Sequence, residues 1–214
     1  MKDSTRKIID SLFCRYPELK RCEGDIIEVF QIMLHAFQSG KKILVCGNGG
    51  SASDSEHIVG ELMKSFKIPR PLPMEDYSAL QKKYPAEGTY LASNLQCGLK
   101  AIALNSNSTL LTAYSNDVDA DMVFAQQVYA YGEPGDVLLG ISTSGKAINV
   151  NNAIKIASAF GMAAIGLCKE SGGEMLGLCD VCIRVPEEET YLVQELHLPV
   201  YHALCAAIEN EYFS

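Results

Sequence analysis

The sequence predicts an α/β protein built on one parallel sheet. Five short apolar runs recur along the chain, and each is followed by polar or glycine-rich residues and then by a segment with helical periodicity. A repeated order of strand and then helix is typical of a parallel sheet covered by helices on both faces. The expected strands lie at residues 41–46, 99–104, 136–141, 163–167 and 181–185.

The length favours a single domain. The chain has 214 residues, of which 48% are hydrophobic, enough for one full-sized core. Apolar positions at helical spacing predict two helices within residues 1–40, one at about 51–66 and a long one at 190–213. Residues 67–100 do not fit the strand–helix repeat. We therefore expect one domain over 1–214, with a helical N-terminal extension at 1–40 and an insertion of one or two short helices at about 67–100, near the ligand-entry side.

Charge, hydropathy and cysteine usage exclude several classes of protein. The net charge of −8 argues against a nucleic-acid partner, and no apolar run reaches the roughly 20 residues that span a bilayer. The first residues lack the pattern of a secretion signal, which predicts a cytoplasmic protein. Cysteines such as Cys46, Cys168 and Cys205 lie inside apolar runs, so we interpret them as reduced core thiols. Cys179 and Cys182 have CxxC spacing, but no second pair completes a zinc site.

Two strand-to-helix turns have the composition of ligand-binding loops. The GNGGS turn at 47–51 is either a tight turn or a loop whose amides face a ligand, since its glycines allow both. The STSG turn at 142–145 places three hydroxyls directly after a buried strand, where a helix needs only one as its N-cap. The remaining hydroxyls and the turn amides suit an anion. Neither turn has the spacing of a nucleotide-binding loop, which favours the phosphate of a small molecule.

Four polar side chains on two predicted helices are candidates for a metal site. His57 and Glu61 are four residues apart and leave the same helix face, while Gln194 and His202 are eight apart, about 80° around the axis. Such side chains can bind a divalent ion such as zinc. A His–Glu pair at this spacing is also common on helix surfaces. Spacing alone therefore leaves both interpretations open.

Several segments together are similar to a known family. GNGGS at 47–51, SND at 115–117, GDVLLGISTSG at 135–145 and QELH at 194–197 follow one another in this order. In combination they resemble the sugar isomerase (SIS) domain family, and within it the phosphoheptose isomerases. The resemblance covers nearly the whole chain apart from the insertion. It implies a three-layer αβα domain with a five-stranded parallel sheet, and a homotetramer or a dimer.

The resemblance also implies roles for particular residues. His57, Glu61, Gln194 and His202 would bind one zinc or other divalent ion per subunit. Glu61 would be the base and His202 the acid of an aldose–ketose isomerisation, acting on a phosphorylated sugar such as sedoheptulose 7-phosphate. The residues that would contact the substrate are Asn48, Gly49, Gly50, Ser51, Asn116, Asp117, Ser142, Thr143, Ser144 and Gln194.

Some positions depart from the family pattern. Ala147 replaces a hydroxyl of the phosphate loop, Ser65 stands where phosphoheptose isomerases carry Arg, and Tyr191 stands where they often carry Asp. The sugar is therefore less defined than the class of reaction. Pro199 lies inside the last predicted helix and removes a backbone hydrogen bond, which favours a kink. The alternative function is a non-catalytic SIS protein that binds a sugar phosphate or a partner protein in a regulatory role.

Overall fold

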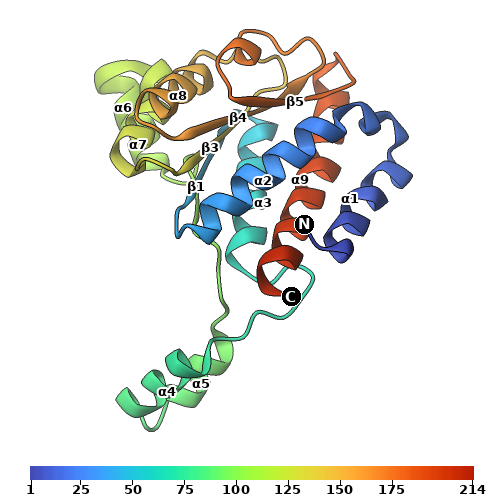
Figure 1. Cartoon of the computed structure of the whole chain (residues 1–214). Helices are drawn as coiled ribbons and strands as arrows, with labels where there is room; N and C mark the ends of the chain where they lie inside the picture. Colours follow the sequence, from blue (N-terminus) through green and yellow to red (C-terminus); the bar gives the residue numbers. More distant parts are fainter.

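A single parallel sheet forms the centre of the molecule. The computed structural model describes all residues from Met1 to Ser214. Its five strands follow the order β2-β1-β3-β4-β5, and every neighbouring pair is parallel. Helices cover both faces of the sheet, so the predicted three-layer α/β architecture is confirmed (Figure 1). The strands are β1 (Ile43–Gly47), β2 (Ala101–Ala103), β3 (Val137–Ile141), β4 (Ala163–Lys169) and β5 (Val181–Val185).

The register of the sheet brings the two predicted ligand loops together. Side chains alternate between the faces: Ile43 and Val45 belong to one buried core, and Leu44 to the core on the opposite face. The order of strands reverses at β1, because β2 lies on one side of it and β3 on the other. Ligands of open parallel sheets bind at the carboxyl ends of strands at such a switch point. There Gly47 pairs with Ile141, so the turns that follow β1 and β3 begin side by side.

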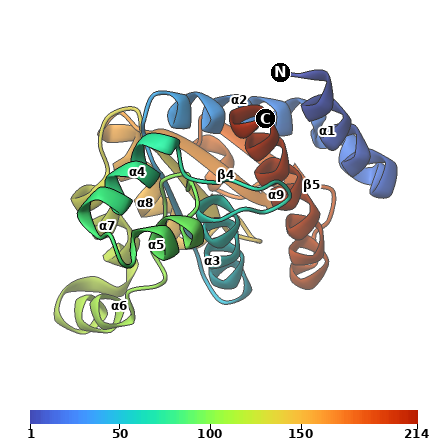
Figure 2. The same ribbon diagram turned by 90° about the horizontal axis from the view of Figure 1, so that it is seen from below.

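Three helices pack on one face of the sheet, a fourth, α1, packs against α9, and the larger of the two cores lies among them. Both α3 and α9 run back from the carboxyl edge of the sheet and contact one another, so they lie side by side and parallel. The last helix continues through Pro199. Figure 2 shows this layer from below. Its members are α1 (Asp3–Arg15), α2 (Glu23–Gln38), α3 (Gly50–Met63) and α9 (Thr190–Phe213).

The opposite face is covered by fewer helices. Here α7 and α8 pack against each other and against the smaller core, which includes Val128 and Ile154. No helix of the structure is both long enough and apolar enough to cross a bilayer. All eight cysteines are free thiols, although the sulfur atoms of Cys168 and Cys182 lie only 3.2 Å apart. The helical segments on this side are α6 (Ser108–Tyr114), α7 (Val123–Tyr131) and α8 (Ile148–Ala159).

The helix after β1 is shorter than the sequence predicts. It ends at Met63 rather than at residue 66, and Lys64 has an extended backbone. Arg70, which lies beyond the end of the helix, accounts for this early end. Its guanidinium donates to the carbonyl oxygens of Leu62 at 2.7 Å and Glu61 at 3.3 Å. These carbonyls thus find partners outside the helix, and the chain leaves the helix axis one turn early.

The segment that does not fit the repeat forms a helical hairpin. Its helices α4 (Met74–Lys83) and α5 (Gly88–Asn94) pack on each other and project away from the body of the protein (Figure 1). The stem is two extended strands of chain joined by an antiparallel bridge between Pro71 and Gln96. No residue of α4 is buried. The base of the stem contacts α9, through the backbone of residues 66–68 and the side chain of Arg70.

Candidate functional site

The turns after β1 and β3 line one cavity. Its volume is about 350 Å³, within the size range of small-molecule sites. The amino ends of α3, α8 and α9 all border it, so backbone N–H groups and helix dipoles favour a negatively charged ligand there. We call this cavity the phosphate pocket. It is lined by Asn48, Gly49, Gly50, Ser51, Ile141, Ser142, Thr143, Ser144, Ala147, Thr190 and Gln194.

Glycines make the close approach of these loops possible. A Cβ atom on Gly50 would lie 2.5 Å from Nε2 of Gln194, so α3 and α9 meet at this point only because no side chain intervenes. Gly145 has a φ of 64°, in the left-handed region, and a Cβ there would overlap the carbonyl oxygen of Gly172. The STSG turn at 142–145, which we call the serine loop, thus packs against the loop that follows β4.

Two residues of the pocket region were not predicted. Asn149, in the first turn of α8, exchanges two amide hydrogen bonds with Asn48, at 2.8 and 3.0 Å. The pair connects the GNGGS turn at 47–51, which we call the glycine turn, to α8. Thr190, at the start of α9, adds a hydroxyl to the lining. Asn149 could have been noticed, because it follows the STSG turn by four residues.

Asn116 and Asp117 lie elsewhere. They belong to the π-helical turn η2 (Ser115–Asp119), are exposed, and are joined by a hydrogen bond of 2.8 Å from Nδ2 of Asn116 to Oδ1 of Asp117. This segment follows the edge strand β2 and the helix α6, so it does not line the phosphate pocket. Their role in substrate binding stays a prediction.

Three of the four predicted metal-site residues come together between α3 and α9. The Nε2 atom of His57 lies 3.4 Å from Oε1 of Glu61 and 3.4 Å from Nε2 of His202. Nζ of Lys64 pairs with the other carboxylate oxygen of Glu61 at 2.6 Å. The Glu61 side chain is only 12% exposed, against 42% for His57. We call His57, Glu61 and His202 the His–Glu cluster.

The fourth predicted ligand, Gln194, is not part of this cluster. It packs against Gly50 in the phosphate pocket, eight residues before His202, which is about 12 Å along the axis of α9. Two positions eight apart share a helix face, but a straight helix does not bring them to one point. No group of His, Cys, Asp and Glu side chains has the geometry of a metal centre in the structure.

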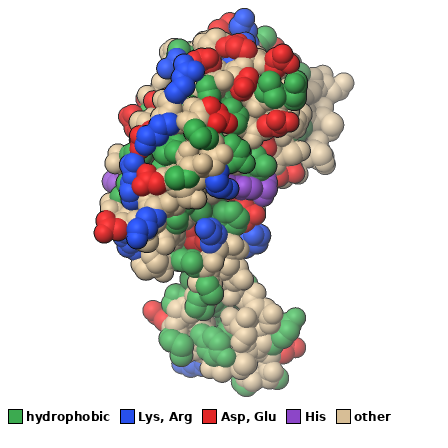
Figure 3. Space-filling view, turned by 90° about the vertical axis from the view of Figure 1, so that its right-hand side faces the viewer, with side chains coloured by type: hydrophobic (Ala, Val, Ile, Leu, Met, Phe, Trp, Pro, Cys, Tyr) green, Lys and Arg blue, Asp and Glu red, His purple; other side chains and the backbone are tan.

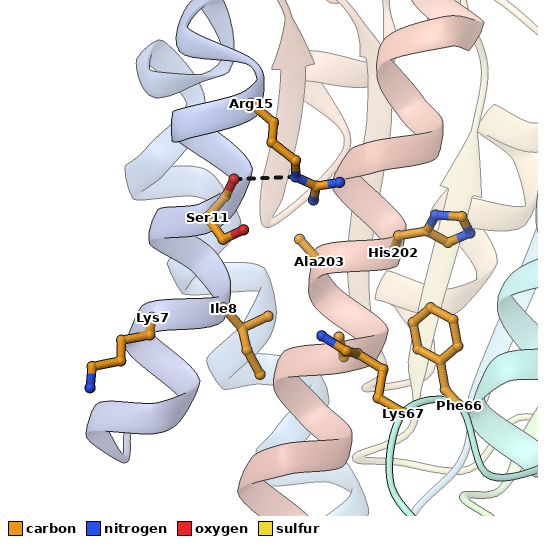
Figure 4. A pocket seen from close by; sticks show the side chains of 9 residues that line it. Lys7, Ile8, Ser11, Arg15, Phe66, Lys67, His202 and Ala203 are labelled. Atoms are coloured by element: carbon orange, nitrogen blue, oxygen red, sulfur yellow. Dashed lines mark hydrogen bonds between the residues drawn. The ribbon is translucent and has the colours of Figure 1, made fainter.

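A second cavity opens beside His202. It lies between α1 and α9, has a volume of about 530 Å³, and is lined by three cationic side chains, Lys7, Arg15 and Lys67 (Figure 4). Phe66 packs against the ring of His202, with 5.6 Å between the ring centroids. Burial, together with the neighbouring His57, lowers the pKa of His202. The cavity therefore opens next to His202 on a side that is lined by positively charged side chains.

Tyr201 and Asp54 lie behind the His–Glu cluster and were also not predicted. The Tyr201 hydroxyl is 3.0 Å from Nδ1 of His57 and donates to Oδ1 of Asp54 at 3.2 Å. The Tyr201 side chain is buried, and burial raises the pKa of Asp54. A signal existed in the sequence, because Asp54 stands one helical turn before His57. By contrast His197 is buried away from the cluster, and burial lowers its pKa to about 4.

Comparisons with known proteins agree with this architecture. The SIS domain family matches residues 18–94 and 81–168. A phosphoheptose isomerase of Maridesulfovibrio salexigens is 39% identical over 97% of this chain and 85% of its own, and one of Rhodospirillum rubrum is 36% identical over 98% of both. The solved phosphoheptose isomerase of Neisseria gonorrhoeae superposes with a TM-score of 0.70 at 31% identity, over 94% of this chain and 98% of that one.

The chain therefore belongs to the SIS domain family. Its similarity extends over nearly its whole length to curated phosphoheptose isomerases. It is an enzyme of the same class, the sugar-phosphate isomerases.

Proposed function

We propose that the chain is a metal-assisted aldose–ketose isomerase that converts sedoheptulose 7-phosphate into an aldoheptose 7-phosphate in the cytoplasm. The observation that carries the proposal is the spacing of its two sites on α3 and α9. His57 stands seven residues beyond Gly50, about 10 Å along α3. An extended seven-carbon chain spans about 10 Å from C1 to the phosphorus, whereas a five-carbon chain spans about 7 Å. A heptose phosphate thus reaches from the phosphate pocket to the His–Glu cluster.

The phosphate end is bound by hydroxyls and amides. Ser142, Thr143 and Ser144 supply three hydroxyls, and the amino end of α8 supplies the field that favours an anion. Gln194 is placed to contact the sugar chain next to Gly50. The cations of the second cavity attract a phosphorylated substrate towards a protein that carries a net charge of −8.

The other end of the sugar undergoes two pairs of proton transfers. Glu61 removes a proton from C1 of the ketose, His202 gives a proton to O2, and the enediol forms. Glu61 then returns a proton to C2 while His202 takes the proton from O1, which becomes the aldehyde oxygen.

A divalent ion, zinc or another, fits the donor set of the His–Glu cluster. Two imidazole nitrogens and a carboxylate oxygen are the ligand types of a catalytic zinc site, and they approach one another to 3.4 Å. His57, Glu61 and His202 would hold one ion per subunit. Such an ion supplies Lewis-acid polarisation of the sugar carbonyl. Gln194 contacts the substrate in the phosphate pocket and is not one of these ligands.

The hairpin supports an assembly of several copies, for which a homotetramer is the proposed form. Met74 is 73% exposed, Tyr90 72% and Leu95 52%, and these apolar side chains lie on a hairpin that buries nothing in the body (Figure 3). Sedimentation equilibrium is expected to show tetramers that dissociate in the variant Met74→Glu/Tyr90→Glu. The control Leu176→Glu changes an apolar side chain on the body that is 43% exposed and should leave the mass unchanged. A monomeric wild-type chain would contradict the assembly.

Turnover tests the proposed reaction directly. The purified chain with zinc and sedoheptulose 7-phosphate is expected to produce an aldoheptose phosphate, detected by NMR of the anomeric protons. The five- and six-carbon ketose phosphates are expected to react more slowly, because they do not span the two sites. Binding without turnover of any ketose phosphate would favour the alternative, a non-catalytic sugar-phosphate-binding protein, and would overturn the proposal.

A further inference from the structure

We infer that Tyr201 and Asp54 are positioning residues that set the orientation and the tautomer of His57. The inference rests on the proposed function, in which His57 presents Nε2 to the substrate side of the cluster. It concerns two residues to which neither the family resemblance nor the comparisons give a role. Its test below is made on the free protein, so it does not depend on turnover.

The contacts form a chain that begins in the protein interior. Oδ1 of Asp54 accepts a hydrogen bond of 3.2 Å from the Tyr201 hydroxyl, and the same hydroxyl lies 3.0 Å from Nδ1 of His57. Tyr201 is 2% exposed, so water does not compete for its hydroxyl. Because Asp54 and His57 are neighbours on α3 while Tyr201 comes from α9, the chain of contacts also locks the two helices together.

Donor and acceptor roles in this chain are fixed by proton counting. A carboxylate only accepts, so the single hydroxyl proton of Tyr201 goes to Asp54. With that proton directed at Asp54, the hydroxyl has no second proton to offer. The tyrosine oxygen can then only accept from His57, which must carry its proton on Nδ1. The other ring nitrogen, Nε2, is left with a lone pair.

That lone pair faces the carboxylate of Glu61 and the imidazole of His202. Nε2 of His57 is 3.4 Å from the carboxylate of Glu61 and 3.4 Å from Nε2 of His202. A lone pair on Nε2 of His57 beside a carboxylate oxygen is the donor chemistry that suits a cation. The opposite tautomer would point an N–H into the cluster. The Tyr201 hydroxyl therefore determines whether Nε2 of His57 presents a lone pair or an N–H group to the His–Glu cluster.

The ring of Tyr201 contributes separately from its hydroxyl. Its centroid is 5.5 Å from the ring of His57 and 5.0 Å from that of His202, both in edge-to-face arrangements. The variant Tyr201→Phe keeps these ring contacts and removes only the hydroxyl. Its effect on His57 thus reports the hydrogen bond rather than the packing.

Nitrogen-15 NMR of histidine side chains in the zinc-free protein measures the tautomer. We expect the Nδ1–H form of His57 in the wild type and a shift towards the Nε2–H form in Tyr201→Phe. In Asp54→Ala the shift should be more complete, because the freed hydroxyl donates to Nδ1. The matched control Tyr129→Phe removes an exposed hydroxyl on α7 and should leave His57 unchanged.

Zinc affinity, measured by calorimetry, gives a second readout that does not involve substrate. Tyr201→Phe is expected to weaken binding about 10–100-fold, the usual effect of losing a partner of a metal-ligating histidine. A His57 tautomer and a zinc affinity that are both unchanged in Tyr201→Phe and Asp54→Ala would overturn the inference. A tautomer that shifts as expected in a chain without isomerase activity would uphold the positioning role and count against the proposed function alone.

Discussion

Glu61→Gln is expected to lower kcat for the isomerisation by about 10²–10⁴-fold, with a much smaller change in KM. The amide has the size of the carboxylate but cannot accept the proton from C1. Gly50 of the phosphate pocket lies eleven residues before Glu61, about 16 Å away along α3, so ground-state binding of the substrate is retained. Steady-state kinetics with the preferred ketose phosphate measures both constants, and circular dichroism checks that the variant is folded.

The matched control for this change is Glu56→Gln. Glu56 lies on the same helix but is exposed, and its contact is a long hydrogen bond of 3.4 Å from the hydroxyl of Ser106. Its replacement should leave kcat within about twofold, since exposed substitutions away from the site cost little. A folded Glu61→Gln protein with a wild-type kcat would remove Glu61 from the role of base.

Glu209→Gln is expected to destabilise the fold by about 3–5 kcal/mol. The Glu209 carboxylate is 1% exposed and pairs with the fully buried Arg70 at 2.7 Å. It also accepts hydrogen bonds from the backbone N–H groups of Phe66 at 2.8 Å and Lys67 at 2.7 Å. The amide leaves the Arg70 charge buried without a counter-ion. Urea denaturation measures the free energy of unfolding.

The exposed ion pair of Glu188 provides the comparison. Glu188 is 53% exposed and pairs with Lys169 at 2.6 Å, so Glu188→Gln should cost far less stability than Glu209→Gln. Adding Arg70→Met to Glu209→Gln is expected to recover part of the lost stability, because the unpaired buried charge is then absent. Equal losses in Glu209→Gln and Glu188→Gln would show that the buried pair does not hold the stem of the hairpin.

The fold could be predicted from the sequence because its signals are local. Each strand is a short apolar run followed by a turn and a helical pattern, and the two-sided burial of β1 is visible in its uninterrupted apolar residues. The end of α3 could not be predicted in this way. It depends on Arg70, whose position is set by Glu209, a residue 139 positions further along the chain.

In the candidate site, too, the local features could be predicted and the long-range contacts could not. The serine loop and the glycine turn were both expected at strand ends, and the sheet topology places them in one cavity. Helix spacing alone left the set of four ligands open, and the resemblance to the phosphoheptose isomerases implied it; an axial rise of about 12 Å separates Gln194 from His202 along α9. Tyr201 was missed because a tyrosine within an apolar helix resembles any core residue until its hydroxyl is seen to meet His57 and Asp54.

One measurement tests the central claim, that Glu61 transfers a proton between C1 and C2 of a sugar phosphate bound in the phosphate pocket. Sedoheptulose 7-phosphate is incubated with the zinc-loaded protein in D₂O, and the product is examined by proton and carbon NMR. We expect deuterium at C2 of the aldoheptose phosphate with the wild type and none with Glu61→Gln. Absence of both product and exchange in the wild type, with the substrate bound, would contradict it.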